Sequence, residues 1–504
     1  MKARWLTLFA CLPLIAGITL LQSCGGVGGP NGSQTYAGSN APTQNFLALL
    51  TPSQKAAKYI GPEACGASTC HGGAPSAHVA GHLASATIGH AKPTSGVGQY
   101  ATWKQTLHAQ KGVTCESCHG PGSVHQAQPK ATDGTANAIL TFPKVTSVEV
   151  CGQCHGPQHD EFNVSKHSQL ITSPISSTVT GPTTSGQASQ CFVCHGGLTR
   201  AQYTENGILP AQMTSTQIVN VANDILNTVP NVASCATCHN PHAKTGNLTG
   251  KGKEVQLYHP EALTDSSGIV AGQPVTKFAY VNQICAQCHN GRATNGTDAY
   301  LQTSTSRSSA HHSDQFNSLL GVGGNESASG PPIRSGTHAQ APGQCATCHM
   351  PGSRHTMTVS YDGCAPCHTT TDAAARASSL QAEILGDLTT LETRMANWSQ
   401  KTFGDPSFWD YTSNIAAGKT PPNQTLIPIE VKRARHNYYY VVISGDLGIH
   451  NPAYTRYLLQ WSATNLTNAG IPKVNPSEIS RIPVAEQLKH FKALRKQAAA
   501  VSAE

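Results

Sequence analysis

Hydrophobic and polar residues follow a helical pattern near the end of the chain, beginning at Asp372. Apolar residues recur there at spacings of three and four, which places them on one face of a long α-helix. This predicted face consists of Leu380, Ile384, Leu388, Leu391, Met395 and Trp398.

A second long helix is expected after the break at Pro421-Pro422. It should start near Ile427 or Pro428 and stop before Gly445, since glycine commonly ends helices. His436 and Tyr440 are four residues apart and would share one face of this helix.

Two further helices complete the predicted C-terminal region. Asn451-Pro452 is typical of an N-cap followed by proline at the first helical position, so His450 should lie at the entrance of that helix. An amphipathic helix is expected over residues 484–500. Residues 372–504 are therefore predicted to form a helical region, suited to packing or to dimerisation.

Residues 58–371 show little sustained periodicity of either kind. The whole chain has 504 residues with 47 Gly and 31 Pro, and only 12% of them are charged and 38% hydrophobic. A chain so rich in turn formers does not easily bury a large core of its own side chains. An apolar group other than the side chains must therefore fill part of the interior. The net charge of +7 comes from scattered residues, and we expect no nucleic-acid partner.

The cysteines indicate the identity of this apolar group. Sixteen of the 18 cysteines form eight pairs, and a histidine follows the second member of each pair. The first pair has a wider C-x4-C-H spacing and the other seven are C-x-x-C-H. The eight motifs are Cys65-Cys70-His71, Cys115-Cys118-His119, Cys151-Cys154-His155, Cys191-Cys194-His195, Cys235-Cys238-His239, Cys285-Cys288-His289, Cys345-Cys348-His349 and Cys364-Cys367-His368.

This pattern predicts eight covalently attached c-type haems. Two thiols add to the two vinyl groups of a haem, and the adjacent histidine ligates the iron from the proximal side. Zinc sites and disulfides also use cysteine pairs, but neither requires a histidine after every second cysteine. The wider pair, Cys65 and Cys70, leaves the most room for the disulfide alternative.

Sixteen of the 24 histidines lie outside these motifs, twice the number that eight distal positions need. Ligation by two histidines closes both axial positions of the iron and favours electron transfer over substrate binding. His125 and His355 end two similar C-H-x-P-G-S-x-H stretches, and His108 and His338 each precede a first cysteine by seven residues. The predicted distal ligands are His78 (or another member of its cluster with His82 and His90), His108, His125, His167, His242, His311 (or His312), His338, His355, His436 and His450.

The first residues predict export. Lys2 and Arg4 precede an apolar run that ends at Leu21-Gln22-Ser23-Cys24, which is similar to the lipobox of bacterial lipoproteins. An ordinary signal peptide is the alternative. Residues 1–23 would be the signal and residues 24–57 a flexible tether. We therefore expect an outer-membrane lipoprotein anchored through Cys24, on the periplasmic or the cell-surface face.

Several segments resemble the hydroxylamine oxidoreductase and ammonia-forming nitrite reductase superfamily of multihaem cytochromes. They are residues 112–122, 310–313, 345–351 and 448–452, together with the helical tail. The resemblance implies that His450 is an axial ligand. The C-x-x-C-K motif that carries the catalytic haem of the nitrite reductases is absent from this sequence.

The sequence thus predicts a mostly α protein with extensive irregular loops, in which residues 58–371 hold a core of stacked haems. The leading hypothesis is electron transfer through eight mostly bis-histidine haems to other redox proteins. The alternative is an oxidoreductase that acts on a small nitrogen or sulfur compound at one five-coordinate haem. In the related hydroxylamine oxidoreductases a tail tyrosine is cross-linked to that haem, which draws attention to Tyr438, Tyr439 and Tyr440. A homo-oligomer or filament is a third possibility.

Overall fold

The computed structural model describes the greater part of the C-terminal region and separate segments before it. The described residues are 52, 56–67, 71, 99–127, 148–169, 194, 197, 200, 233–247, 254–262, 283–291, 296–303, 313–334, 336–365, 367–410, 419–420, 422–479 and 482–501. The predicted signal peptide, and the tether up to residue 51, lie outside them. No helix in these ranges is long and apolar enough to cross a membrane.

Helices account for the regular structure of these segments, which contain no strand and a single antiparallel bridge between His239 and Leu257. The predicted mostly α class with irregular connections is confirmed for the described part. In the first part of the chain the α-helices are α3 (Pro62–Cys65), α5 (Gln99–Trp103), α6 (Leu107–Gln110), α7 (Cys115–His119), α8 (Ser123–Ala127), α9 (Val148–Gly152), α10 (Gly156–Asn163), α15 (Cys235–Cys238), α16 (Asp298–Thr303), α17 (Gln315–Leu320) and α18 (Cys345–His349). The C-terminal helices are α19 (Thr370–Phe403), α20 (Ile429–Ser444), α21 (Pro452–Asn468), α22 (Pro476–Ile479) and α23 (Val484–Val501). Short 3₁₀ turns are η2 (Lys166–Gln169), η5 (Thr337–Gln340), η6 (Pro351–Ser353), η7 (Tyr361–Cys364) and η8 (Gln424–Leu426).

The C-terminal helices have the boundaries that the sequence predicts. The side chain of Thr369 caps α19 by accepting from the backbone N–H of Asp372, and Gly404 ends it in the left-handed conformation. Gly445 ends α20 in the same way. Asn451 caps α21 by accepting from the N–H of Tyr454. Each signal satisfies backbone groups that a helix end leaves without a partner.

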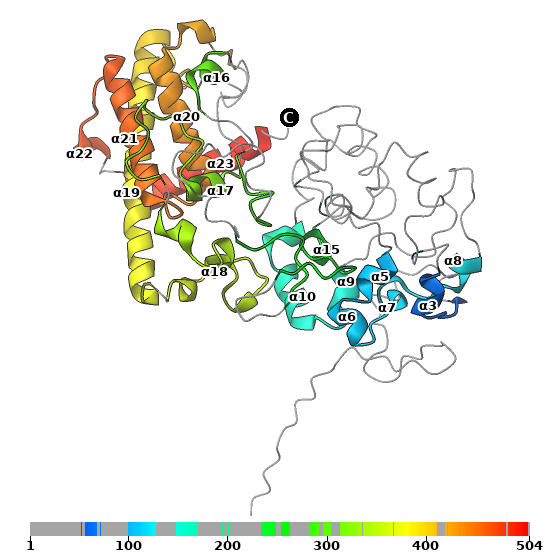
Figure 1. Cartoon of the computed structure of the whole chain (residues 1–504). Helices are drawn as coiled ribbons and strands as arrows, with labels where there is room; N and C mark the ends of the chain where they lie inside the picture. The colour runs from blue at the N-terminus through cyan, green and yellow to red at the C-terminus, as the bar shows by residue number, and fades with distance from the viewer. Residues whose placement is uncertain are drawn as a thin grey trace, which may run out of the picture.

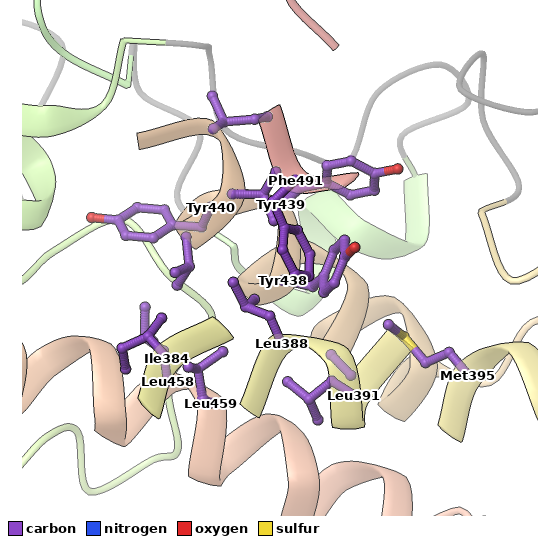
Figure 2. Close-up of a cluster of buried hydrophobic side chains, with 14 of the residues drawn as sticks. Ile384, Leu388, Leu391, Met395, Tyr438, Tyr439, Tyr440, Leu458, Leu459 and Phe491 are labelled. Atoms are coloured by element: carbon purple, nitrogen blue, oxygen red, sulfur yellow. The ribbon is translucent and has the colours of Figure 1, made fainter. Parts of the chain in front are cut away.

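These helices pack into a bundle with a core of their own side chains (Figure 1). Ile384, Leu388 and Met395 of α19 are fully buried and face the tyrosines of α20 and Leu458 of α21 (Figure 2). Phe491 brings α23 onto the same core. At about 25 cal/mol per Å² of buried apolar surface, such a cluster stabilises the fold substantially.

A buried arginine fixes α19 against the end of α21. The guanidinium of Arg394 donates to the backbone carbonyls of Ala463 at 3.0 Å, Pro472 at 3.0 Å and Ile471 at 2.7 Å. Burial lowers the pKa of this guanidinium. Because it donates to carbonyls both within α21 and in the segment that follows it, it holds the end of α21 and residues 471–472 against α19.

The bundle is tied to the cysteine-bearing part through residues 313–340. Asn451 donates to the carbonyl of Arg334 at 2.7 Å, and Gln315 donates to the carbonyl of Ser444 at 2.9 Å. His338 faces the carbonyl of Ile449 at 2.8 Å. The connection between α20 and α21, which carries His450, is therefore held against the motif region.

Candidate haem-binding site

The cysteine motifs fold as short helical turns that direct both sulfurs and the histidine to one side. We number the eight motifs as sites 1 to 8 in chain order. In sites 3, 5 and 6 the histidine N–H donates to the carbonyl of the first cysteine, four residues earlier, at 2.9 Å. Residues at spacings of three and four share a helix face, so in these three motifs the side chains lie toward one ring-sized area.

Local capping explains why these turns form at the motifs. The N–H of Thr114 donates to Ser117 at 3.1 Å at site 2, and the N–H of Ser234 donates to Thr237 at 2.9 Å at site 5. In each pair the second hydroxyl lies between the two cysteines of the motif. The residues between the cysteines therefore begin the turn that the attachment chemistry needs.

Site 1 has the wider cysteine spacing, and its backbone closes in the same way. The N–H of His71 donates to the carbonyl of Cys65 at 3.2 Å, although six residues separate them. His71 returns to the position relative to the first cysteine that the histidines of the other motifs occupy.

Five histidines of the motifs each face one histidine from outside the motifs. The ring centroids of these pairs lie 6.0 to 6.4 Å apart. The pairs are His119 with His242 (site 2), His155 with His108 (site 3), His239 with His355 (site 5), His289 with His167 (site 6) and His349 with His450 (site 7). The structure therefore brings five of the ten predicted distal histidines opposite a predicted proximal one.

The spacing of the rings fits one iron between them. A metal–imidazole bond is about 2 Å long and the ring centroid lies about 1.1 Å behind the nitrogen, so two axial imidazoles have centroids about 6.2 Å apart. The interplanar angles range from 11° for His119–His242 to 86° for His167–His289. Direct ring contacts favour particular angles, whereas two rings bound to one iron can each turn about their own bond. The shared feature is the distance, as ligation requires.

Hydrogen bonds at Nδ1 leave Nε2 of several of these rings available for a metal. His239 Nδ1 lies 2.7 Å from the carbonyl of Val255, and His349 Nδ1 lies 3.3 Å from that of Met357. His289 Nδ1 faces the side-chain oxygen of Gln315 at 3.3 Å. An acceptor at Nδ1 holds the proton there and orients the ring, as is common for metal-ligating histidines.

Burial keeps most of these imidazoles neutral, which a metal ligand must be. Burial lowers the pKa of His155, His239, His289 and His349. Burial and the neighbouring His289 lower the pKa of His167 to about 4. These rings would be uncharged at neutral pH.

His450 has a different electrostatic environment from these rings. Burial alone would lower its pKa, but the Asp446 carboxylate, 3.0 Å from Nδ1, reverses the effect and raises the pKa. Burial opposes ionisation of Asp446, yet His450 and the hydroxyl of Ser444 hold the pKa of its carboxyl well below the usual range. His450 thus has a carboxylate beside Nδ1, whereas His239, His289 and His349 have a carbonyl or an amide oxygen there.

Thiols from different motifs meet in pairs. Thiols perturb the pKa of one another between sites 1 and 2, 3 and 5, 4 and 6, 6 and 7, and 7 and 8, so they lie close together. The pairs are Cys65–Cys115, Cys151–Cys235, Cys194–Cys288, Cys285–Cys345 and Cys348–Cys364. Burial and these contacts raise the pKa of one thiol in several pairs, including Cys348, whose pKa rises to about 11.

The remaining predicted ligands are less fully placed. His436 is buried in α20, with Nε2 3.2 Å from the carbonyl of Gly323, and ligation through Nε2 would require that contact to open. His338 is exposed, with Nδ1 against Ile449. Five residues of the prediction lie outside the described ones, namely Cys70, His78, Cys191, His195 and His311, and the side chain of His125 is not described either.

Sequence reasoning missed the groups behind the ligands. Asp446, Gln315 and the carbonyl of Val255 lie at Nδ1 of three paired histidines. A further omission is Glu116, inside the site 2 motif. Its buried carboxylate accepts from the N–H groups of Ile60, Gly61 and Gly122 at 2.7 to 3.1 Å. Only Asp446 had a visible signal, its position four residues before His450.

The structures similar to this chain include two multihaem cytochromes. An undecahaem cytochrome from the S-layer of Carboxydothermus ferrireducens aligns at 18% identity with a TM-score of 0.41, over 72% of this chain and 51% of its own. The outer cell wall cytochrome OcwA aligns at 19% identity with a TM-score of 0.40, over 70% of each chain. The chain thus spans about half the length of the first. No protein-family model and no curated protein matches this sequence.

Proposed function

We propose that this chain is a multihaem c-type cytochrome that transfers electrons through eight covalently attached, mostly bis-histidine haems. The observation that carries the proposal is the set of five histidine pairs 6.0 to 6.4 Å apart, each joining a motif histidine to one outside the motifs. The haems would hold iron by the two imidazoles and supply reversible one-electron chemistry. Closure of both axial positions favours conduction over conversion of a substrate.

Shared chain segments support close spacing of the haems. His239 belongs to site 5, and His242, three residues later, faces the proximal histidine of site 2. His349 belongs to site 7, and His355, six residues later, faces that of site 5. Such short segments can reach two irons only when the two haems are neighbours.

The thiol pairs extend this connection to all eight sites. Through them site 1 neighbours site 2, site 8 neighbours site 7, and site 3 neighbours site 5. Site 4 neighbours site 6, which in turn neighbours site 7. The main path then runs through sites 1, 2, 5, 7 and 8. In Figure 1 the motif helices α3, α7, α9, α15 and α18 lie in a row that ends at the foot of α19. A continuous row suits a wire between two partners at opposite ends.

The tyrosines of α20 support conduction rather than catalysis. The hydroxyl of Tyr438 donates to Glu392 at 2.9 Å, that of Tyr439 to Asp410 at 2.6 Å, and that of Tyr440 to the carbonyl of Val322 at 2.7 Å. All three rings are buried in the bundle core. Their phenols are engaged in packing and hydrogen bonding, so they favour a structural role over a cross-link to haem.

We further infer, from the sequence, that Cys24 anchors the chain to the outer membrane, with other redox proteins as partners. The test of the whole proposal uses the exported protein with its haems attached. Intact mass should show eight haems, and electron paramagnetic resonance of the oxidised protein should show low-spin iron at every site. High-spin iron, or ready binding of cyanide at one haem, would instead support the oxidoreductase.

A further inference from the structure

The connection between α20 and α21 places a fixed negative charge behind one predicted haem ligand. Asp446 lies four residues before His450, and its Oδ2 is 3.0 Å from His450 Nδ1. The same oxygen accepts from the backbone N–H of His450 at 2.8 Å. Ring and carboxylate are therefore held by two contacts on one short loop.

The loop is built to keep Asp446 in place. Leu447 and Gly448 both adopt positive φ angles, 50° and 86°, which fold the chain back so that His450 returns to Asp446. The other carboxylate oxygen, Oδ1, accepts from the hydroxyl of Ser444 and, at 3.4 Å, from the N–H of Gly448. A carboxylate that accepts several hydrogen bonds stays ionised even when it is buried.

The corresponding groups at three other paired histidines are neutral. Nδ1 of His239 and of His349 face backbone carbonyls, and Nδ1 of His289 faces the amide of Gln315. Within site 7 the two ligands therefore differ, because His349 has a carbonyl and His450 has a carboxylate. A buried anion 3.0 Å from Nδ1 acts on the imidazole through its electric field and makes it a stronger electron donor.

We propose that Asp446 lowers the reduction potential of the haem at site 7 by polarising His450. A stronger donor and a nearby negative charge both stabilise ferric over ferrous iron. This inference rests on the proposed bis-histidine haem at site 7. Site 7 contacts sites 5, 6 and 8 through His355 and the thiol pairs, so its potential would set the direction of electron flow at a junction of the path.

The test is Asp446→Asn in the full haem-loaded protein, followed by a redox titration monitored by electron paramagnetic resonance. One of the eight one-electron steps should move to a more positive potential, with haem content and low-spin ligation retained. Asp446→Glu, which keeps the charge, should return that step toward the wild-type value. If no step moves in Asp446→Asn while all eight haems remain low-spin, the inference fails and the proposed function stands.

Two variants serve as matched comparisons. Asp372 lies 3.5 Å from Nδ1 of His368 at site 8, but both side chains are more than a third exposed, so water screens the charge. Asp372→Asn should therefore shift the reduction potential of a one-electron step by less than Asp446→Asn does. Gln315→Glu places a carboxylate behind His289 and should move a different step to a more negative potential. Loss of low-spin iron in Asp446→Asn would mean that Asp446 only positions His450, and would also overturn the inference.

Discussion

The C-terminal helices and the cysteine-bearing segments of residues 58–371 differ in the groups that form their interiors. From Leu380 to Phe491 the chain buries its own leucines, isoleucines and tyrosines between helices. In the described parts of residues 58–371 the most regular feature is a set of imidazoles and thiols that face one another across ring-sized spaces. The first half is organised around groups that would bind the proposed haems, and the second around side chains that exclude water.

The largest expected effect follows from removing the cofactor. Without haem attachment, residues 58–369 lack the haems that would fill the spaces between their histidines. The bundle keeps its apolar core of side chains. We expect limited proteolysis of the haem-free full chain to digest the first half and to leave a fragment that starts near Thr370. Haem-loaded protein is the control, and both of its halves should resist proteolysis. Equal resistance of both halves without haem would contradict the comparison.

The bundle itself can be weakened without touching the haem region. Leu388 is fully buried in α19, so Leu388→Ala should cost about 3 kcal/mol of stability through lost burial and the cavity that remains. Chemical denaturation followed by far-ultraviolet circular dichroism measures this loss. The haem absorption spectrum should be unchanged in the folded protein. Leu107→Ala on exposed α6 is the matched control and should have little effect.

The haem region should respond instead to loss of a polar contact. Glu116 is fully buried and accepts from three backbone N–H groups. Glu116→Ala leaves those donors without a partner, at a cost of about 2 kcal/mol. Hydrogen exchange at Ile60, Gly61 and Gly122 should become faster, while the bundle amides keep their protection. Glu116→Gln retains an acceptor, so its exchange rates at these amides should lie between those of the wild type and of Glu116→Ala. Unchanged exchange rates in the alanine variant would count against the role of this carboxylate.

The sequence is informative about both halves, for different reasons. In the bundle, periodicity and caps are local signals, so α20 ends and α21 begins where Gly445 and Asn451 predict, and α19 begins two residues before the expected Asp372. In the haem region the attachment motif is local and visible. The opposite histidine is not, because His155 pairs with a residue 47 positions earlier and His349 with one 101 positions later. Distal ligation is a property of the tertiary fold.

Groups that act behind the ligands were harder still to predict. Gln315 and Val255 have no motif, since a backbone carbonyl or an amide can come from any segment that passes the ring. Their identity depends on how loops pack, and loops rich in Gly and Pro carry little periodic information. His436 shows the same limit, because its position on α20 is as expected while its Nε2 faces Gly323.

The smallest expected effect is a pH dependence confined to the bundle. His490 of α23 lies 3.0 Å from Glu392 of α19, which also accepts from Tyr438. The hydrogen bond to Glu392 raises the pKa of His490. The pair therefore adds stability below the unfolded pKa of about 6.5, and this contribution is lost as pH rises through the folded value. Because about half of the imidazole is exposed, water screens the pair and the gain should be about 0.3 to 0.5 kcal/mol. Denaturation of wild type and His490→Gln at pH 5.5 and 8.5 measures the difference, which should narrow at the higher pH. A difference of the same size or larger there would assign the stabilisation to packing of the ring on Phe491 instead of to its charge.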